Sequence, residues 1–422
     1  MDRTQFDKPP RWWGPRLSPA WIRLLRPLRL RMQRRVQRLL DVDVRGIEHL
    51  RAAVDAGQGV LITPNHSGHA DTFILYHAAD QLARPFYFMA AWQVLGLVNP
   101  VRRAVLRWHG CFSVDREGTD LTAFKQAVEI LQSRPNPLVI FPEGEVYHVN
   151  ERVTPFREGP ATIALSAAKR AERPVVCVPC GIRYFYTSDP TPELLALMDR
   201  LEQEIFWRPA RELPLPERIY RFAEGMLALK ELEYLGQTSA GPLPARVAAL
   251  ADAILQRLEA CYGIEAAGRT VPERVKSLRQ QVIEKRAALG AGEGKGTGSR
   301  PASPNPATAE SASVPVPFPS HDADRTRCDD ELDDLYFVIQ LFSYPGDYVA
   351  EKPTIERLAE TLDKFEEDVL RRQTATIRGT RRAVVSFGEP VVVDGKARSR
   401  DAGPELTRLL EQRVQALLDA AT

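Results

Sequence analysis

The chain has 422 residues, of which 44% are hydrophobic, and its 57 Lys and Arg nearly balance 55 Asp and Glu. Such length and apolar content exclude a globally disordered chain and favour more than one folded unit. The charge is unevenly spread, because residues 1–40 carry a net charge of +9, which leaves −7 for the rest. This split excludes a uniformly basic nucleic-acid-binding protein and indicates an acidic partner for the N-terminus, either nucleic acid or anionic lipid.

The N-terminal segment mixes large apolar side chains with arginine. Residues 12–40 interleave tryptophan and leucine with arginine, and Pro27 interrupts or kinks the helix they form. This composition is typical of a helix that lies at a membrane surface. An ordinary amphipathic helix packed on the next domain is the alternative, and contact with nucleic acid is a third. We interpret residues 1–41 as a basic amphipathic segment that contacts anionic membrane lipid through residues 12–40.

Apolar stretches elsewhere are short. None reaches the roughly 18 consecutive apolar residues of a spanning helix, and recurring arginines interrupt any signal peptide at the N-terminus. The five cysteines are scattered and odd in number, which makes a disulfide framework improbable and favours a reducing compartment. Cys177 and Cys180 are interpreted as buried thiols of a strand rather than metal ligands. We expect a cytoplasmic protein that is soluble or peripherally attached to a membrane.

Residues 42–190 alternate short apolar runs with helical stretches, which predicts an α/β core with a mixed sheet covered by helices. Strands are expected at 59–63, 86–89, 111–114, 138–141 and 175–178. Helices are expected at 71–82, 92–108, 119–133 and 159–171.

The second half of the chain changes character twice. Residues 191–290 have Leu, Glu, Arg and Ala at helical spacing and are predicted to be a large helical insertion. Residues 291–324 are a Gly/Ser/Pro/Ala linker that we expect to be disordered. Residues 325–422 are expected to complete the core with an amphipathic helix at 354–371 capped by Thr354, strands at 383–387 and 390–393, and a helix at 404–420.

Polar residues directly follow the first expected core strand, in the order Pro64-Asn-His-Ser-Gly-His-Ala-Asp71. Side chains at the carboxyl ends of strands lie where α/β folds place their sites. A carboxylate in the first turn of a helix can hold one ring nitrogen of a preceding histidine, which leaves the other nitrogen to act as a general base. His66 and Asp71 are therefore candidate catalytic residues.

Two other interpretations of this motif stay open. A metallo-hydrolase needs His-x-His-x-Asp-His, whereas this chain has His66-x-x-His69 and Thr72 after the aspartate, so we expect no metal site. The motif can also be only a helix cap and a structural hydrogen bond. Taken alone, it does not separate these readings from catalysis.

Further motifs follow other expected strands. Phe141-Pro-Glu-Gly-Glu145 forms a turn that can project a carboxylate, and Arg116, at the end of Gly110-Cys-Phe-Ser-Val-Asp-Arg116, can reach a phosphate. Pro155-Phe-Arg-Glu-Gly159 opens a helix, and Val178-Pro179 lies in the last core strand.

This ordered set closely resembles the glycerolipid acyltransferase family, whose founding activity is 1-acylglycerol-3-phosphate O-acyltransferase. The family shows His, four residues and Asp, then Gly-x-Phe-x-x-Arg, then Phe-Pro-Glu-Gly, then Val-Pro. The corresponding positions in this chain follow in the same order: His66 and Asp71; Gly110, Phe112 and Arg116, spaced one residue wider; 141–144; and Val178 with Pro179. The resemblance covers about 42–190, and residues 385–390 are similar to the family's closing strand.

The resemblance implies that His66, oriented by Asp71, deprotonates an acceptor hydroxyl that attacks the thioester of acyl-CoA or acyl-carrier protein. Direct attack requires no Ser or Cys nucleophile, in keeping with a sequence that has no Gly-x-Ser-x-Gly elbow. The acyl thioester is a co-substrate, and no cofactor is implied. The implied substrate-binding residues are Gly110, Phe112, Arg116, Glu143 and Gly144, with Arg116 holding the phosphate of a glycerolipid acceptor.

The chain departs from the family at Glu145-Val146, where many lysophosphatidate acyltransferases have Thr-Arg. Glu145 should repel a phosphate, so either the acceptor is not lysophosphatidate or Arg157 and Arg152 supply the missing charge. The form Phe-Pro-Glu-Gly-x-Val is somewhat more similar to the tafazzin type of lysophospholipid acyl transfer.

A catalytically silent membrane-binding scaffold is the alternative of another class. With a lipid acyltransferase signature present, anionic lipid replaces nucleic acid as the expected partner of residues 12–40.

Overall fold

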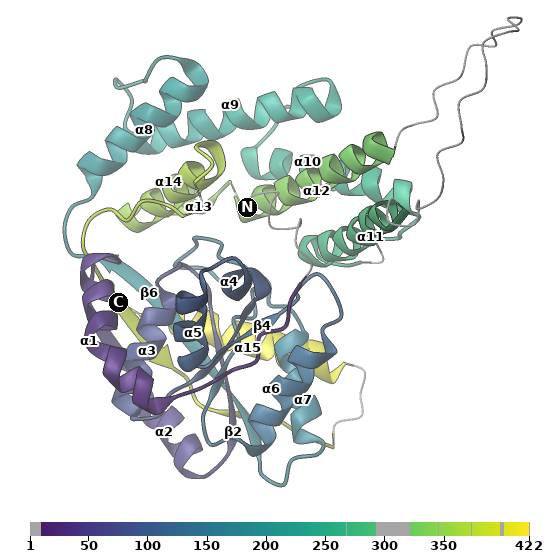
Figure 1. Cartoon of the computed structure of the whole chain (residues 1–422). Helices are drawn as coiled ribbons and strands as arrows, with labels where there is room; N and C mark the ends of the chain where they lie inside the picture. Colours follow the sequence, from purple (N-terminus) through teal and green to yellow (C-terminus); the bar gives the residue numbers. More distant parts are fainter. Residues whose placement is uncertain are drawn as a thin grey trace, which may run out of the picture. The chain divides into compact units, whose positions relative to one another are not determined.

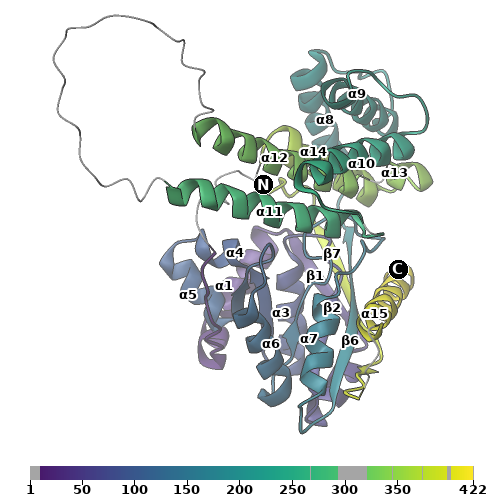
Figure 2. The same ribbon diagram turned by 90° about the vertical axis from the view of Figure 1, so that its right-hand side faces the viewer.

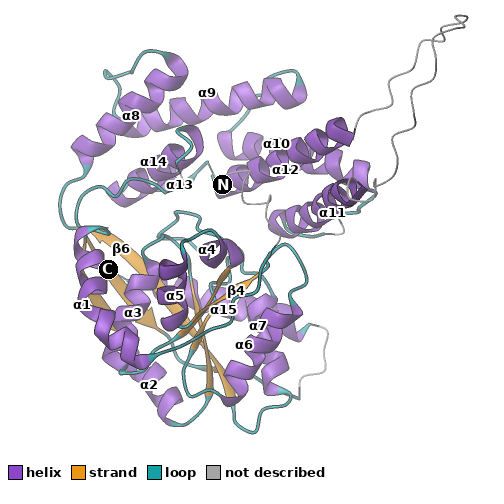
Figure 3. Cartoon of the chain, viewed as in Figure 1, coloured by secondary structure: helices purple, strands orange, loops and turns teal. Residues whose placement is uncertain are grey.

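The computed structural model describes residues 10–266, 268–292, 321–344, 346–372, 374–396 and 401–421. They fall into two compact units. We call the first the sheet unit; it comprises the described residues up to Gly225 and from Asp347 onward. The second, the helical unit, comprises Met226–Gly346. Figure 3 shows that the described strands belong to the sheet unit and that the other unit is made of helices.

The first part of the sheet unit alternates helices and strands in chain order. Its elements are α1 (Pro19–Arg35), β1 (Leu39–Arg45), α2 (Ile47–Asp55), β2 (Gly59–Pro64), α3 (Asp71–Leu82), β3 (Tyr87–Ala91), α4 (Trp92–Gly96), α5 (Pro100–Trp108), β4 (Cys111–Val114), α6 (Leu121–Ser133), β5 (Leu138–Val139), α7 (Gly159–Ala168), β6 (Val175–Tyr186) and α8 (Thr191–Phe206).

The rest of the chain passes through the helical unit and returns to the sheet. Helix α9 (Leu215–Leu235) runs from one unit into the other, and the helical unit continues with α10 (Leu243–Tyr262), α11 (Val271–Gly292) and α12 (His321–Ser343). The returning elements are α13 (Tyr348–Glu351), α14 (Ile355–Val369), β7 (Arg381–Phe387), β8 (Val391–Val392) and α15 (Ala402–Asp419).

The sheet is mixed and has the strand order β1-β7-β6-β2-β5-β3-β4, with β8 paired to β6. Strands β6, β2, β5, β3 and β4 are parallel to their neighbours in this order, whereas β7 is antiparallel to β6. The carboxyl ends of the parallel strands therefore share one edge of the sheet, and the loops that follow them lie together.

Helices cover both faces of the sheet, as Figures 1 and 2 show. One core joins strand side chains to buried residues of α2 and α3, such as Leu50 and Ile74. The other joins them to α6, α7 and α15, through residues such as Ile130, Ala164 and Val414. Strands buried on both sides are apolar throughout, as β2 is. The predicted α/β fold with a mixed sheet, covering helices and a helical insertion is confirmed.

Most predicted core elements are present within a few residues of their expected ends, and three differ. Strand β6, predicted at 175–178, continues to Tyr186. The single helix expected at 92–108 is two helices, because Asn99 caps a new helix that begins at Pro100. Strand β1 lies at Leu39–Arg45, where no strand was expected and where the predicted N-terminal segment overlaps it. Thr354 caps α14 as predicted, accepting a hydrogen bond from the Arg357 backbone.

The predicted linker at 291–324 is described only at its ends. There, residues 291–292 close α11 and residues 321–324 open α12, so these six residues are helical. Residues 293–320 lie outside the described residues.

The helical unit has its own packing. Helices α10, α11 and α12 contact one another, and their buried residues include Leu255, Leu278 and Leu335. The Arg274 side chain, which is nearly buried, joins α11 to α10 through Glu259 at 2.8 Å. Among the described residues, no helix has the length and apolar character needed to cross a bilayer.

Candidate active site

The candidate residues gather where three parallel strands end. His66 follows β2, Glu143 follows β5 and Arg116 follows β4. These strands have their carboxyl ends at the same edge of the sheet, so loops that are far apart in the sequence meet there.

The centre of the site is the pair formed by His66 and Asp71. His66 Nδ1 lies 2.8 Å from Asp71 Oδ2. Asp71 is completely buried in the first turn of α3, whereas the His66 side chain is 19% exposed. The carboxylate thus holds Nδ1, which leaves Nε2 available on a ring that reaches solvent. This is the arrangement of a general base.

Two further donors hold the Asp71 carboxylate. The Gly68 backbone N–H donates to Oδ2 at 3.1 Å, and the Tyr184 hydroxyl of β6 donates to Oδ1 at 2.6 Å. A buried carboxylate needs such partners, because burial without hydrogen bonds costs several kcal/mol. Together with the bond to His66, they fix the orientation of the carboxylate.

The His66 ring and its loop are also held from the side. The ring stacks on Phe141 with centroids 4.0 Å apart. The neighbouring Asn65 is buried and bonds the backbone of Ile182 in β6 in both directions, at 2.7 and 3.0 Å. These contacts limit the rotation of the imidazole and anchor the loop that carries it.

Glu143 forms a hydrogen bond with the loop that carries His66. Its side chain is 3% exposed, and Oε1 accepts a hydrogen bond from the His66 backbone N–H at 3.0 Å. The Thr154 hydroxyl donates to Oε2. Burial raises the pKa of this carboxyl to about 8, although the hydrogen bonds from Thr154 and His66 act in the opposite direction. The geometry makes Glu143 a positioning residue for His66.

Two arginines flank the backbone at Gly144. The Arg116 guanidinium donates to the Gly144 carbonyl. A Cβ at Gly144 would lie 2.6 Å from Arg157 Nε, and φ is +82°, so this position requires glycine. Arg157 also lies 3.9 Å from the Glu145 carboxylate. By contrast, Arg152 forms ion pairs with Asp347 and Glu351, which hold it elsewhere.

Gly110 and Phe112 lie away from this edge. Gly110 is in the turn before β4, with φ at +87° and the Phe86 carbonyl 2.4 Å from where its Cβ would be. Phe112 is completely buried inside β4. The structure therefore brings Arg116 to the site and leaves Gly110 and Phe112 to shape the strand that carries it.

One comparison with known proteins covers this part of the chain. Residues 41–183 match the model of the family described as Acyltransferase. This region is therefore an acyltransferase domain. The match contains His66, Asp71 and the residues that flank them, and the acyltransferase domain transfers acyl groups to a lipid acceptor. A search of curated proteins finds no match to the chain.

Three residues that support the acyltransferase site were not identified from the sequence. Tyr184 lies 113 positions after Asp71, and Thr154 lies 11 positions after Glu143. Asn65 lies next to His66, but its partner Ile182 is 117 positions away. Knowledge that β2 pairs with β6 would have been needed to identify Asn65 and Tyr184 as site residues, because this pairing brings the end of β2 next to β6.

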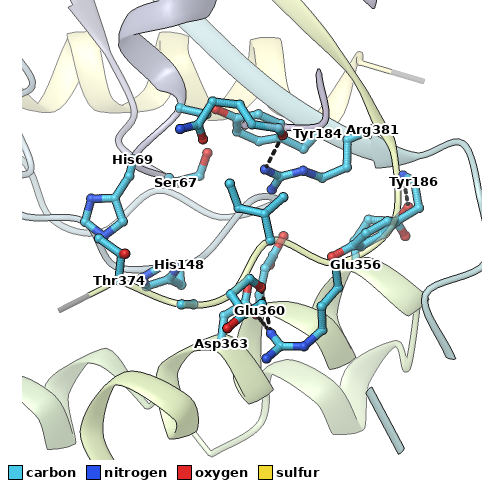
Figure 4. Close-up of a pocket in the computed structure, with 17 residues that line it drawn as sticks. Ser67, His69, His148, Tyr184, Tyr186, Glu356, Glu360, Asp363, Thr374 and Arg381 are labelled. Carbon is cyan, nitrogen blue, oxygen red and sulfur yellow. Dashed lines mark hydrogen bonds and ion pairs between the residues drawn. The ribbon is translucent and has the colours of Figure 1, made fainter. Parts of the chain in front are cut away.

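A cavity of about 130 Å³ lies beside the Asp71 loop in the acyltransferase domain (Figure 4). Ser67, Gly68 and Tyr184 line one part of it, and residues 374–378 and α14 line another. His66 is not among its lining residues. The cavity therefore adjoins the groups that hold Asp71 and is not lined by the His66 ring.

Proposed function

We propose that this protein is an O-acyltransferase that moves a fatty acyl group from an acyl thioester, acyl-CoA or acyl-carrier protein, to the hydroxyl of a glycerolipid acceptor such as lysophosphatidate. One observation carries the proposal. The buried Asp71 holds His66 Nδ1 at 2.8 Å, while the His66 side chain remains partly exposed. A base held in this way needs only a hydroxyl and an activated acyl group.

The chemical step follows from this pair. His66 Nε2 takes the proton of the acceptor hydroxyl as its oxygen bonds to the thioester carbonyl carbon. The carbonyl becomes a tetrahedral oxyanion, and its collapse breaks the C–S bond. The imidazolium returns the proton to the leaving thiolate. Asp71 remains a carboxylate throughout and stabilises the imidazolium that forms.

Arg116 and Arg157 are the groups that would bind the headgroup phosphate. Both lie against Gly144, in the turn that carries Glu143, and Glu143 bonds the His66 backbone. Arginine suits this task, because its planar guanidinium donates two parallel hydrogen bonds to phosphate oxygens.

A lysophospholipid acceptor of the tafazzin type is the second candidate, and the contact between Glu145 and Arg157 favours it. The 3.9 Å approach offsets one of the two arginine charges. The remaining single positive charge matches a phosphodiester, which carries one negative charge, better than the monoester of lysophosphatidate, which carries nearly two.

Helix α1 is the surface by which we propose that the enzyme reaches its acceptor. Its polar residues Arg29 and Gln33 are buried, and Arg29 forms an ion pair with Asp80 at 2.5 Å. The exposed face instead carries large apolar side chains at helical spacing: Trp21, Leu24, Leu28 and Met32. A helix with its apolar side outward is stabilised by a membrane surface.

Charge supports the same partner. Arg31, Arg34 and Arg35 are exposed on α1, and each basic residue near an anionic leaflet contributes about 1 kcal/mol of binding. Trp21 stacks on Trp108 of α5 with ring centroids 4.4 Å apart, which attaches the helix to the domain. Anionic lipid is therefore the proposed partner of residues 12–40.

The test uses purified protein, acyl-CoA or acyl-carrier-protein thioester, and a panel of lysophosphatidate, lysophospholipids and lipid alcohols, with products identified by mass spectrometry. We expect His66→Gln to lose transfer by about 10³-fold or more. The matched control His77→Gln changes a half-buried histidine of α3 that bonds Gln81, and this variant should keep transfer. Unchanged turnover in His66→Gln would refute the mechanism. A wild-type protein that binds vesicles but acylates no acceptor would support the silent scaffold instead.

A further inference from the structure

Three potential metal ligands from distant parts of the chain converge beside the catalytic loop. His69 lies between β2 and α3, His148 lies in the segment after β5, and Glu367 lies on α14. His148 Nε2 is 3.1 Å from Glu367 Oε2, and His69 Nε2 is 3.4 Å from Glu367 Oε1. The three ligand atoms all lie within 4.8 Å of one another.

These distances agree with zinc coordination. Zinc binds imidazole nitrogen and carboxylate oxygen at about 2.0–2.2 Å, so ligand atoms of a tetrahedral site lie roughly 3.3 Å apart. The two contacts between imidazole and carboxylate have about this length, although each runs to a different oxygen of Glu367. Small side-chain rotations would bring one carboxylate oxygen and the two imidazole nitrogens into range of a single ion. Two imidazoles with one carboxylate suit zinc and similar transition metals, whereas magnesium and calcium prefer oxygen ligands.

The surroundings hold the ligands in place. The Ala375 backbone N–H donates to Glu367 Oε1 at 2.7 Å, which orients the carboxylate in the way that outer partners orient metal ligands. His148 has φ at +50°, an uncommon conformation for a residue other than glycine. It directs a nearly buried imidazole toward α14. Figure 4 shows His69 and His148 next to each other at the cavity, beside Thr374.

One ligand remains open to solvent. The His69 side chain is 45% exposed, which provides a route of entry for an ion and room for a water molecule as a fourth ligand. The same cavity is lined by Glu356, Glu360 and Asp363 and by two arginines, Arg378 and Arg381, of which Arg378 is paired with Asp363 at 2.7 Å.

We propose that His69, His148 and Glu367 form a binding site for a divalent transition-metal ion of the zinc class. Binding replaces the two contacts between imidazole and carboxylate with metal bonds. The proton that each Nε2 donates to Glu367 is released to solvent or transferred to Nδ1, so that Nε2 can bind the ion and Nδ1 carries the remaining proton. His69 lies in the four-residue segment that separates His66 from Asp71. The ion thus ties this segment to α14, which belongs to the part of the chain that follows the helical unit.

The experiment measures zinc binding to the tag-free full chain, with zinc chloride as the probe. Protein stripped with chelator is dialysed against zinc, its metal content is determined by mass spectrometry, and its affinity is measured by calorimetry. We expect one zinc per chain and a binding constant at least about ten-fold weaker in His69→Gln and in Glu367→Gln. The control His77→Gln changes a half-buried histidine of α3 outside the cluster and should bind as the wild type does.

Thermal unfolding gives an independent readout that does not depend on acyl transfer. An ion that binds only the folded state raises the melting temperature. We expect zinc to raise it for the wild type and His77→Gln, but not for His69→Gln or Glu367→Gln. Since His69 is half-exposed and Glu367→Gln keeps its shape, circular dichroism should show both variants folded. Zinc binding that is substoichiometric, or equal in all four proteins, would overturn the proposal. It would show that His69, His148 and Glu367 form only a hydrogen-bonded cluster.

Discussion

At Asp71, two donors share one carboxylate oxygen. Oδ2 accepts from Gly68 N–H and from His66 Nδ1, while Oδ1 accepts from the Tyr184 hydroxyl. In an asparagine variant, the Gly68 N–H favours the amide oxygen at the Oδ2 position, and the amide nitrogen can donate to the Tyr184 hydroxyl. The imidazole therefore keeps its tautomer, and the substitution removes mainly the charge that stabilises the imidazolium.

Asp71→Asn is accordingly expected to lower kcat for acyl transfer by about 10²–10³-fold with little change in KM. This loss is smaller than that of a variant that also reverses the tautomer, which reaches about 10⁴-fold in a hydrolase triad. Tyr184→Phe removes one hydrogen bond to the carboxylate and should cost about ten-fold or less. Steady-state kinetics of both variants separate the two effects. A kcat of Asp71→Asn within two-fold of the wild type would contradict this role of the charge.

Glu143 gives a prediction on stability and pH. Burial raises the pKa of its carboxyl to about 8 in the folded protein, from an ordinary value of 4.5. Between these values the folded state holds a proton that the unfolded state releases. The contribution of Glu143 to stability is therefore complete below pH 4.5 and is lost as pH rises toward 8. Glu143→Gln resembles the protonated form and should become more stable than the wild type at high pH.

The measurement is urea unfolding of wild type and Glu143→Gln at pH 5, 7 and 9. The difference in the free energy of unfolding should shift in favour of the variant by a few kcal/mol across this range, since one pKa unit corresponds to about 1.4 kcal/mol. Glu158→Gln, at the exposed start of α7, serves as the control and should follow the wild type. Parallel profiles for all three proteins would show that Glu143 is already ionised near neutral pH.

At the scale of elements, sequence patterns identify the buried strands and their flanking helices but not every boundary. Strand β4 and helix α3 have the expected ends, because apolar runs and helical spacing reveal them directly. Strand β1 was not predicted, because its alternation of leucine or valine with aspartate directly follows an arginine-rich helix with no turn residue between them. The split between α4 and α5 is visible in Asn99-Pro100, a cap that the continuous helical spacing conceals.

Helix α1 carries its apolar residues on the exposed side, as a membrane-bound helix would. Leu24 and Leu28 are 66% and 56% exposed, so replacing them with serine leaves the packing of the helix on the domain intact. A Leu24→Ser and Leu28→Ser double variant should bind vesicles of phosphatidylglycerol and phosphatidylcholine about one hundred-fold more weakly, because each leucine contributes about 1.5 kcal/mol when buried in lipid. Vesicle sedimentation measures the change.

The control for α1 replaces exposed leucines of other helices. Leu121→Ser and Leu409→Ser, on α6 and α15, should leave vesicle binding unchanged. Wild-type binding should also weaken at high salt, because basic residues of α1 contribute to it. Equal sedimentation of both double variants would assign the membrane contact to another surface. Point substitutions are preferable to removal of residues 1–40, since Trp13 bonds Ser113 of β4 in both directions and β1 begins at Leu39.

For the whole molecule, the sequence identifies the groups that do chemistry better than those that hold them. His66 and Asp71 lie five residues apart, and Glu143 and Arg116 follow predicted strands, so local spacing reveals all four. Tyr184 and Glu367 lie near the same region because of the tertiary structure. Sequence spacing cannot predict a contact between positions more than one hundred residues apart. The position of β7 between β1 and β6 is likewise known only from the strand order of the sheet.

The order of strands also shows that the matched family region is not a complete folding unit. Residues 41–183 contain β2 to β5 and most of β1 and β6. Strand β7 fills the space between β1 and β6 and comes from beyond the helical unit. Without β7 and α15, β1 loses its strand partner, β6 keeps only β2 beside it in the strand order, and one core loses the side chains of Leu410 and Val414. The chain after Asp347 is therefore needed for the sheet, whereas the helical unit has a core of its own.

This division predicts that the helical unit can be removed. Residues 226–346 are replaced by about eight Gly and Ser residues, which span roughly 16 Å as a flexible coil. The ends to be joined are close, because the Tyr220 hydroxyl bonds the backbone of Ala350. We expect a soluble protein with one cooperative thermal transition and with acyl transfer that still depends on His66.

Removal of 347–422 instead should give aggregated protein, since it deletes β7. Aggregation of the first variant, measured by size-exclusion chromatography, would show that the sheet unit needs the helical unit to fold.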